Sequence, residues 1–281
     1  MAEYLRPTTL SSALEALNGT PWSVLAGGTD FYPARVVRVP DEDVLDISAL
    51  SELRKIEAFP NHWRLGALTT WSDIIRADLP PMFDGLKLAA REVGGVQIQN
   101  MGTLGGNLCN ASPAADGVPP LLSLGASVQI SSVKGVQTMS LKDFIRGSRK
   151  TALEAGQLLT ALIVPKPRQT RAAGHFLKLG ARKYMVISIV MVAANLEIDD
   201  NGNVSAARVS VGACSEVACR LLALEEALAG RACSTLLGEG VTLEHLAPIG
   251  PIDDLRGSAE YRSDAALTLV RRTLNELGAR A

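Results

Sequence analysis

Two glycine pairs, each followed by small polar residues, constrain this chain more than any other feature of its sequence. The first pair lies in Val24-Leu25-Ala26-Gly27-Gly28-Thr29-Asp30-Phe31, where a short apolar run enters the turn. The second lies in Thr103-Leu104-Gly105-Gly106-Asn107. Glycine permits backbone angles and close approaches that side chains would block, and it leaves amide hydrogens free to converge on an anion. The two loops together predict a site for one elongated ligand that carries two phosphates.

The second loop continues into Ala111-Ser112-Pro113, which has the residues of a helix start. Serine is a common N-cap and proline is common at the first helical position, so we expect a helix near 113–124. A helix N-terminus favours negative charge, which suits the same ligand. Neither loop carries lysine or arginine. Taken alone, a Gly-Gly pair is more often a tight turn than a binding site, and the argument therefore depends on both pairs.

Composition limits the classes of protein to which the chain can belong. Its 281 residues suit one large or two modest domains, and its apolar content of 47% is ample for a core. With a net charge of −1 and no run of like charges, nucleic acid and anionic membranes are not expected partners. The first residues lack the basic segment of a signal peptide, and the longest apolar run, 185–194, is too short to span a bilayer. We expect a soluble cytoplasmic protein.

Metal and nucleophile chemistry find no support in the sequence. The four cysteines form no Cys-x-x-Cys pair and the three histidines are scattered, so no metal ligands and no catalytic side chain are predicted. The chain also lacks Gly-x-Gly-x-x-Gly and Gly-Lys-Ser/Thr motifs, which disfavours a classical dinucleotide fold or an ATP site. The cysteines are best explained as reduced, buried side chains.

The first part of the chain predicts two α/β lobes. A helix capped by Thr8 or Thr9, a strand at 22–26 and a strand at 44–47 form a small lobe of about 1–55. The larger lobe, about 56–167, is predicted from a strand at 62–65, a helix that begins at Thr70 with a capping box to Asp73, and a helix at 83–93. Strands at 127–132, 136–138 and 158–164 and a short helix after Ser140 complete it.

A segment with two prolines and three basic residues, 165–171, predicts a domain boundary. Beyond it we expect strands at 174–182, 186–198 and 204–212, the last two joined by a hairpin at Asn201-Gly202. Helices are expected at 216–229 and 259–281. The predicted fold is α+β, with an N-terminal domain at 1–167 and, at 172–281, a three-stranded antiparallel sheet covered by helices.

The order of these motifs resembles the flavoprotein, or medium, subunits of the molybdenum hydroxylases, the xanthine dehydrogenase and carbon monoxide dehydrogenase family. The resemblance covers nearly the whole chain. Besides the two glycine loops it includes Ala111-Ser112-Pro113-Ala114-Ala115-Asp116 and Gly66-Ala67-Leu68-Thr69-Thr70. Tyr4 with Pro7-Thr8, Gly212-Ala213 with Arg220, and Asp254-x-Arg256-x-Ser258-x-x-Tyr261-Arg262 match further family motifs.

The resemblance implies noncovalently bound FAD in a two-lobed domain of the PCMH type, similar to vanillyl-alcohol oxidase. In this family the two loops hold the FAD pyrophosphate. It also places Asp116 near the ribityl chain or the flavin, and Leu159 and Lys178 near the flavin or adenine periphery. The implied FAD-binding residues are Val24, Leu25, Ala26, Gly27, Gly28, Thr29, Asp30, Phe31, Thr103, Leu104, Gly105, Gly106, Asn107, Asp116, Leu159 and Lys178.

The resemblance also implies partner chains. They are a small subunit with two 2Fe–2S clusters and a large subunit with the molybdenum cofactor, assembled as a dimer of heterotrimers. FAD on this chain would pass electrons to NAD⁺ or another acceptor. Two positions depart from many relatives: Gln99 replaces a basic residue, and Met185-Val186 stands where an acidic residue is common. No cysteine-bearing insertion for a 4Fe–4S cluster is present, so FAD is the one cofactor expected on this chain.

Two other functions remain open at this point. A self-contained flavin oxidase of the vanillyl-alcohol-oxidase type shares the FAD-domain class, but the part after residue 171 is short and the first loop has no histidine for covalent flavin attachment. A binding or scaffold module without redox activity is the other alternative. Intact glycine pairs argue against it.

Overall fold

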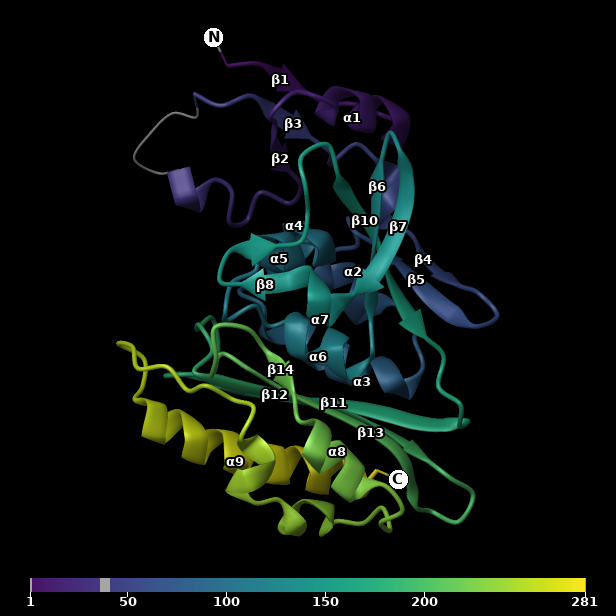
Figure 1. The fold of residues 1–281 in the computed structure, drawn as a ribbon, viewed down its shortest axis with the longest axis vertical. Helices are drawn as coiled ribbons and strands as arrows, with labels where there is room; N and C mark the ends of the chain where they lie inside the picture. Colours follow the sequence, from purple (N-terminus) through teal and green to yellow (C-terminus); the bar gives the residue numbers. More distant parts are fainter. Residues whose placement is uncertain (1, 36–40, 281) are drawn as a thin grey trace.

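The structure is a computed structural model that describes residues 2–35 and 41–280. Three tiers follow one another along its long axis (Figure 1). The N-terminal segment forms a small lobe at one end, the middle of the chain forms a larger lobe, and the last third forms a sheet-and-helix domain at the other end. The predicted two-lobed N-terminal part and α+β class are confirmed.

The small lobe is a parallel sheet with a helix. Its strands are β1 (Tyr4–Leu5), β2 (Ser23–Leu25) and β3 (Val44–Asp46), in the order β1-β3-β2. Helix α1 (Leu10–Leu17) begins at Thr9, whose hydroxyl accepts a hydrogen bond from the Ser12 amide. Two 3-10 helices, Pro33–Arg35 and Ser51–Arg54, complete the lobe. Leucines from the helix, the sheet and the second 3-10 helix form its core.

The larger lobe is built on a five-stranded antiparallel sheet. The strands follow the order β4 (Ile56–Ala58), β5 (His62–Gly66), β10 (Leu158–Pro165), β6 (Ser127–Ser132) and β7 (Gly135–Ser140). A hairpin of β8 (Ile145–Gly147) and β9 (Lys150–Thr151) lies beside it. The helices are α2 (Trp71–Arg76), the 3-10 helix Pro81–Phe83, α3 (Asp84–Glu92), α4 (Val96–Met101), α5 (Leu104–Asn110), α6 (Val118–Ser123) and α7 (Leu141–Phe144).

Local capping signals locate some of these helices correctly and one of them incorrectly. Thr70 and Asp73 form the predicted capping box of α2, and Ser140 caps α7. The expected helix start at Ser112-Pro113 is wrong, because Ser112 accepts from the Ala114 amide in a turn and α6 begins only at Val118. Helices α4 and α5 were expected as loop. The two glycines of α5 lower its helix propensity, but burial of Leu104 and Leu108 outweighs that cost.

The last part of the chain has four antiparallel strands where three were expected. They are β11 (Arg171–Leu179), β12 (Val190–Ile198), β13 (Val204–Gly212) and β14 (Cys219–Arg220). The predicted helix at 216–229 is shortened to α8 (Leu222–Leu228) because Arg220 donates to the buried Glu225 carboxylate, which also accepts the Val209 amide of β13. Two 3-10 helices, Leu237–Gly240 and Leu243–Leu246, lead to α9 (Ala259–Gly278).

Strand β12 is buried along its whole length, because helices cover both faces of its sheet. Val190, Val192 and Ala194 pack with α8 and α9. Met191 and Ala193 point the other way, to Ala89 of α3. Figure 1 shows this arrangement, with α3 and α6 on one side of the sheet and α8 and α9 on the other. The larger lobe therefore supplies half of the cover that this sheet needs.

We propose that the domain boundary lies within 165–171. Pro165 ends β10 of one sheet and Arg171 begins β11 of another. Between them, the amides of Arg168 and Gln169 donate to the buried carboxylate of Glu197. The connection is thus short and pinned at its midpoint. A fragment of 172–281 would expose the face of β12 that α3 covers.

Removal of the Asn195 amide should weaken the junction between the larger lobe and the sheet. Its Nδ2 donates to the Met82 carbonyl at 2.6 Å in a buried position. Asn195→Ala leaves that carbonyl without this donor, which should lower the free energy of unfolding by about 1–3 kcal/mol. Urea denaturation of the whole chain measures this. Asn201→Ala, at an exposed hairpin position, is the control and should change stability by less than about 0.5 kcal/mol. Equal effects of the two substitutions would contradict the assignment.

Candidate functional site

The first glycine loop leaves strand β2 and lies against the larger lobe. A Cβ atom on Gly27 would lie 1.9 Å from the Met101 carbonyl oxygen, so only glycine allows the two backbones to meet there. Gly28 has a φ of +73°, a left-handed conformation that glycine adopts without strain. The loop therefore takes a sharp turn at the point where the two lobes touch.

Successive backbone amides of this loop are free to bind a ligand. In the part of the chain that the structure describes, no group accepts a hydrogen bond from the N–H of Gly27, Gly28, Thr29, Asp30 or Phe31. The carbonyls of Gly28 and Asp30 accept from Tyr32 and Ala34, which fixes the turn without using these donors. Consecutive unpaired amides of this kind form an anion-binding concavity.

The second glycine pair differs from its predicted form, because it lies inside the first turn of α5. Thr103 is the N-cap and accepts from the Gly106 amide at 3.0 Å. The Gly105 amide donates to the Ala67 carbonyl, and a Cβ atom on Gly105 would lie 2.8 Å from that oxygen. Gly105 is thus a packing residue, whereas a Cβ atom on Gly106 would meet just one group among the described residues, the Thr103 hydroxyl at 2.9 Å.

A long cleft with two sections runs along these loops. The first section, of about 520 Å³, lies between the first loop and α5. The second, of about 740 Å³, lies between the larger lobe and the segment that joins β11 to β12. Asp30, Asn107, Asn110 and Arg149 border both sections, which are therefore continuous.

Most of the predicted site residues meet at this cleft. Those that line the first section are Val24, Ala26, Gly27, Gly28, Thr29, Asp30, Phe31, Thr103, Gly106 and Asn107. Asp116 lines the second section. Leu25, Leu104 and Leu159 are core residues and line neither section, and Gly105 packs behind the loop. The buried Oδ1 of Asn107 has no hydrogen-bond partner among the described residues.

Lys178 and Asp116 form a buried ion pair at the far end of the cleft. The Lys178 ammonium lies 2.7 Å from Asp116 Oδ2 and also donates to the Glu92 carbonyl. Ser188 donates to the other carboxylate oxygen at 2.5 Å. Burial raises the pKa of Asp116, and the neighbouring ammonium opposes that rise. The pair joins the larger lobe to the C-terminal sheet and places a charged group at the wall of the second section.

Sequence patterns missed several residues of the cleft. Arg149, in the turn between β8 and β9, forms an ion pair with Asp30 at 2.8 Å. Arg262 is fully buried and its guanidinium bonds Asp254 and the carbonyls of Ile189 and Ala213. Cys109 is exposed and lines the first section. The Asp30–Arg149 pair spans 119 positions, so no local pattern indicates it.

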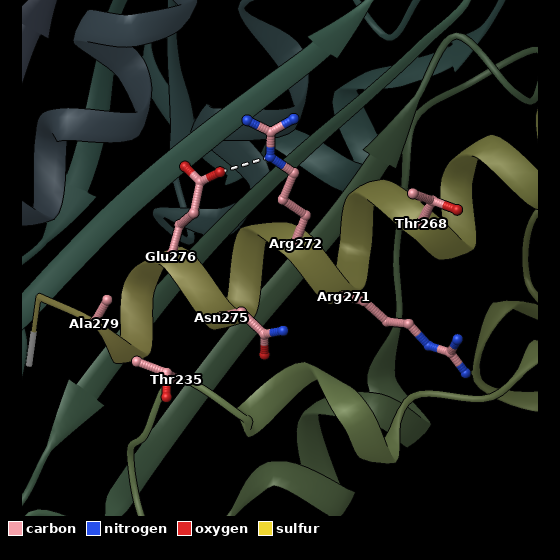
Figure 2. Close-up of a pocket in the computed structure, with 7 residues that line it drawn as sticks. All are labelled: Thr235, Thr268, Arg271, Arg272, Asn275, Glu276 and Ala279. Carbon is pink, nitrogen blue, oxygen red and sulfur yellow. Dashed lines mark hydrogen bonds and ion pairs between the residues drawn. The ribbon is translucent and has the colours of Figure 1, made fainter.

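A separate hollow lies on the outer face of α9 and shares no lining residue with the cleft. Figure 2 shows its side chains, which are Thr235, Thr268, Arg271, Arg272, Asn275, Glu276 and Ala279. Arg272 pairs with Glu276 at 2.7 Å, and Arg271 donates to the Val241 carbonyl. Its charged groups are therefore already satisfied, and it carries none of the predicted site residues.

The cleft fits FAD by its shape and its donors. An elongated dinucleotide needs a long cleft, donors for a diphosphate and polar groups at the ring end. The two adjoining sections and the free amides of the first loop meet the first two needs, and Asp116 places a polar group at the wall of the second section. Gly106 leaves space where a side chain would intrude. Among the described residues, no group of histidine, cysteine and acidic side chains is placed to hold a metal ion, and no helix is long and apolar enough to cross a membrane.

Two family models match the chain. Residues 1–167 match the FAD binding domain in molybdopterin dehydrogenase, and residues 175–277 match the CO dehydrogenase flavoprotein C-terminal domain. The first match alone spans more than half of the sequence.

Individual proteins are similar over most or all of their length. The nicotinate dehydrogenase FAD-subunit of Eubacterium barkeri is 34% identical over 81% of this chain and 79% of its own. The xanthine dehydrogenase FAD-binding subunit of Escherichia coli O157:H7 is 30% identical over 100% of this chain and 97% of its own. A chain of the crystal structure of Cu,Mo-CO dehydrogenase in its cyanide-inactivated form superposes with a TM-score of 0.91 at 26% identity, covering 100% of this chain and 98% of that one.

Loss of Lys178 should leave the Asp116 carboxylate buried without its cation. We expect Lys178→Met to lower the free energy of unfolding of the FAD-free protein by about 3–5 kcal/mol. The double variant Asp116→Asn with Lys178→Met removes both charges and should recover most of that loss. Urea denaturation at neutral pH provides the comparison. A double variant no more stable than Lys178→Met would show that the two groups are not coupled.

Proposed function

The chain belongs to the family of FAD-binding subunits of the molybdenum hydroxylases, and we propose that it is the electron-transfer chain between 2Fe–2S clusters of a partner and a final acceptor. The family resemblance found from the sequence motifs is thereby confirmed. Substrate oxidation in such complexes takes place on the molybdenum chain. NAD⁺ or another electron acceptor is the proposed final oxidant.

The observation that carries this proposal is the run of free amides in the first loop, which faces Gly106 of α5 across the first section of the cleft. The N–H groups of 27–31 would bind the diphosphate, and Gly106 leaves room for it against α5. The Asn107 side chain borders both sections and would contact FAD where they join. Bound FAD would supply the redox chemistry, since its ring system takes up electrons and releases them. The chain itself binds the cofactor, orients it and sets its electrostatic surroundings.

The second section is the proposed place of the flavin ring. Asp116, held by Lys178 and Ser188, would present a fixed polar group to it. The loops around Gly95 and Met185 form the opposite rim, where a Cβ on Gly95 would lie 3.7 Å from the Met185 sulfur. These walls would hold the ring system of bound FAD.

The surface beside this rim supports the proposed partners. Val96, Ile98, Met185 and Ile187 are exposed apolar side chains near the mouth of the second section. Stable interfaces bury roughly 800 Å² on each partner and have apolar centres. We propose a small subunit with two 2Fe–2S clusters and a large molybdenum subunit as partners, assembled as a dimer of heterotrimers. The proposed location of the complex is the cytoplasm.

A branched side chain at position 106 should expel the cofactor while the fold remains. Gly106→Val places methyl groups where the diphosphate is expected, and the loss of one or two hydrogen bonds to it should weaken FAD binding roughly tenfold to hundredfold. Equilibrium titration of the FAD-free protein, followed by flavin fluorescence, measures this affinity. Gly106→Ala should have a smaller effect.

Gly250→Val is the matched control, because a side chain there meets open space and Gly250 lines neither section. It should keep stoichiometric FAD. Full retention of FAD by Gly106→Val would contradict the placement of the diphosphate beside α5.

The isolated chain should not oxidise an organic substrate by itself. Purified with FAD, it should pass electrons from a reductant to a dye. It should not reduce its flavin with a purine, an aldehyde or an N-heterocycle until the molybdenum and iron–sulfur chains are added. Anaerobic flavin bleaching with and without those chains provides the test. Rapid bleaching by such a substrate in the isolated chain would favour the self-contained oxidase instead.

A further inference from the structure

Arg149 occupies an unusual place in the cleft. It lies in the turn between β8 and β9, at the junction of the two sections. Its φ is +58°, a left-handed conformation that costs a residue with a side chain about 1 kcal/mol or more. The backbone is held there by a hydrogen bond from its amide to the Ala111 carbonyl at 2.9 Å. The Arg149 side chain thus lies at the cleft on a backbone conformation that is unfavourable by itself.

The guanidinium is oriented but not saturated. One nitrogen, Nη1, donates both to Asp30 at 2.8 Å and to the Asn110 side chain. In the described part of the chain, Nε and Nη2 have no acceptor. About half of the side chain, 56%, is exposed. Three N–H donors therefore remain available, and their orientation is fixed through Nη1.

The other basic residues around the cleft already form ion pairs with acidic side chains. The described lining of the first section has one other basic residue, Arg35, which pairs with Glu42 and stacks on the Phe31 ring. Lys178 is buried against Asp116, and Arg262 bonds Asp254 and two carbonyls. Arg256, the remaining arginine of the second section, pairs with Asp254 at 2.9 Å. Arg149 is next to the loop of free amides, because its partner Asp30 belongs to that loop.

We infer that Arg149 is the cationic ligand of the diphosphate in this cleft, and this inference depends on the proposed FAD site. Two loops of neutral donors bind a group with about two negative charges, and a planar guanidinium with two parallel free donors is the side chain best suited to pair with a phosphate. Asp30 and Asn110 position it from the small and the larger lobe. The positive charge that binds the diphosphate would therefore come from Arg149, in the hairpin of β8 and β9, which is distant in sequence from the first loop.

Titrations of the whole FAD-free chain with FAD and with ADP test this inference. Arg149→Gln keeps an unbranched polar side chain and removes the charge and the guanidinium fork. Its dissociation constant for FAD should rise about tenfold or more, and the same factor should appear for ADP, which carries the diphosphate without the flavin. Arg149→Lys keeps a point charge without the paired donors. Its dissociation constants should lie between those of the unaltered protein and those of Arg149→Gln. The salt dependence of binding should be weaker in Arg149→Gln than in the unaltered protein.

Arg146→Gln is the matched control, because Arg146 lies on β8, is exposed and does not line the cleft. It should bind FAD and ADP as the unaltered protein does, and thermal unfolding should show both variants folded. Equal affinity and equal salt dependence in Arg149→Gln and Arg146→Gln would overturn the inference while leaving the FAD site intact. Failure of the unaltered chain to bind FAD would overturn the proposed function, and the ADP titration would still decide whether Arg149 binds a diphosphate.

Discussion

The cleft depends on direct contact between backbones at glycines. Where Gly27 meets the Met101 carbonyl, and where Gly174 of β11 meets the Met82 carbonyl, a Cβ atom would lie at 1.9 Å and 2.5 Å from the oxygen. Such contacts bring one lobe to the other without an intervening side chain. The first sets the position of the free-amide loop relative to α5. The second sets the C-terminal sheet against the larger lobe.

Burial on both faces makes the C-terminal sheet a rigid wall. Strand β12 contributes Val192 to one core and Met191 to the other, so neither side can loosen without exposing apolar surface. Polar bonds then fix the register between the layers: Asn195 binds the Met82 carbonyl, and Ser210 donates to the Pro119 carbonyl at 2.6 Å. The Asp116–Lys178 pair belongs to the same junction. A polar group at the ring end of the cleft is thus placed by packing that extends through both domains.

Local signals in the sequence predicted the elements well, and tertiary packing accounts for what they missed. Thr9, Thr70 and Ser140 were found as caps because a cap needs only residues within one turn. Helix α5 was missed because its glycines disfavour a helix until Leu104 is buried in the core. Strand β14 was missed because two residues carry no period, and its pairing depends on Glu225.

The same distinction separates the two kinds of residue in the candidate site. Glycine pairs can be recognised in sequence because their chemistry is local, whereas Arg149 is selected by a partner 119 positions away. The two positions that the family resemblance singles out, Gln99 and Met185, also differ in their place relative to the cleft. Gln99 donates to the Arg91 carbonyl and does not line either section, whereas Met185 lines the second section with a φ of +47° and an exposed side chain. With an uncharged residue at that rim, the charged residues that line the second section are Asp30, Asp116, Arg149, Asp254, Arg256 and Arg262.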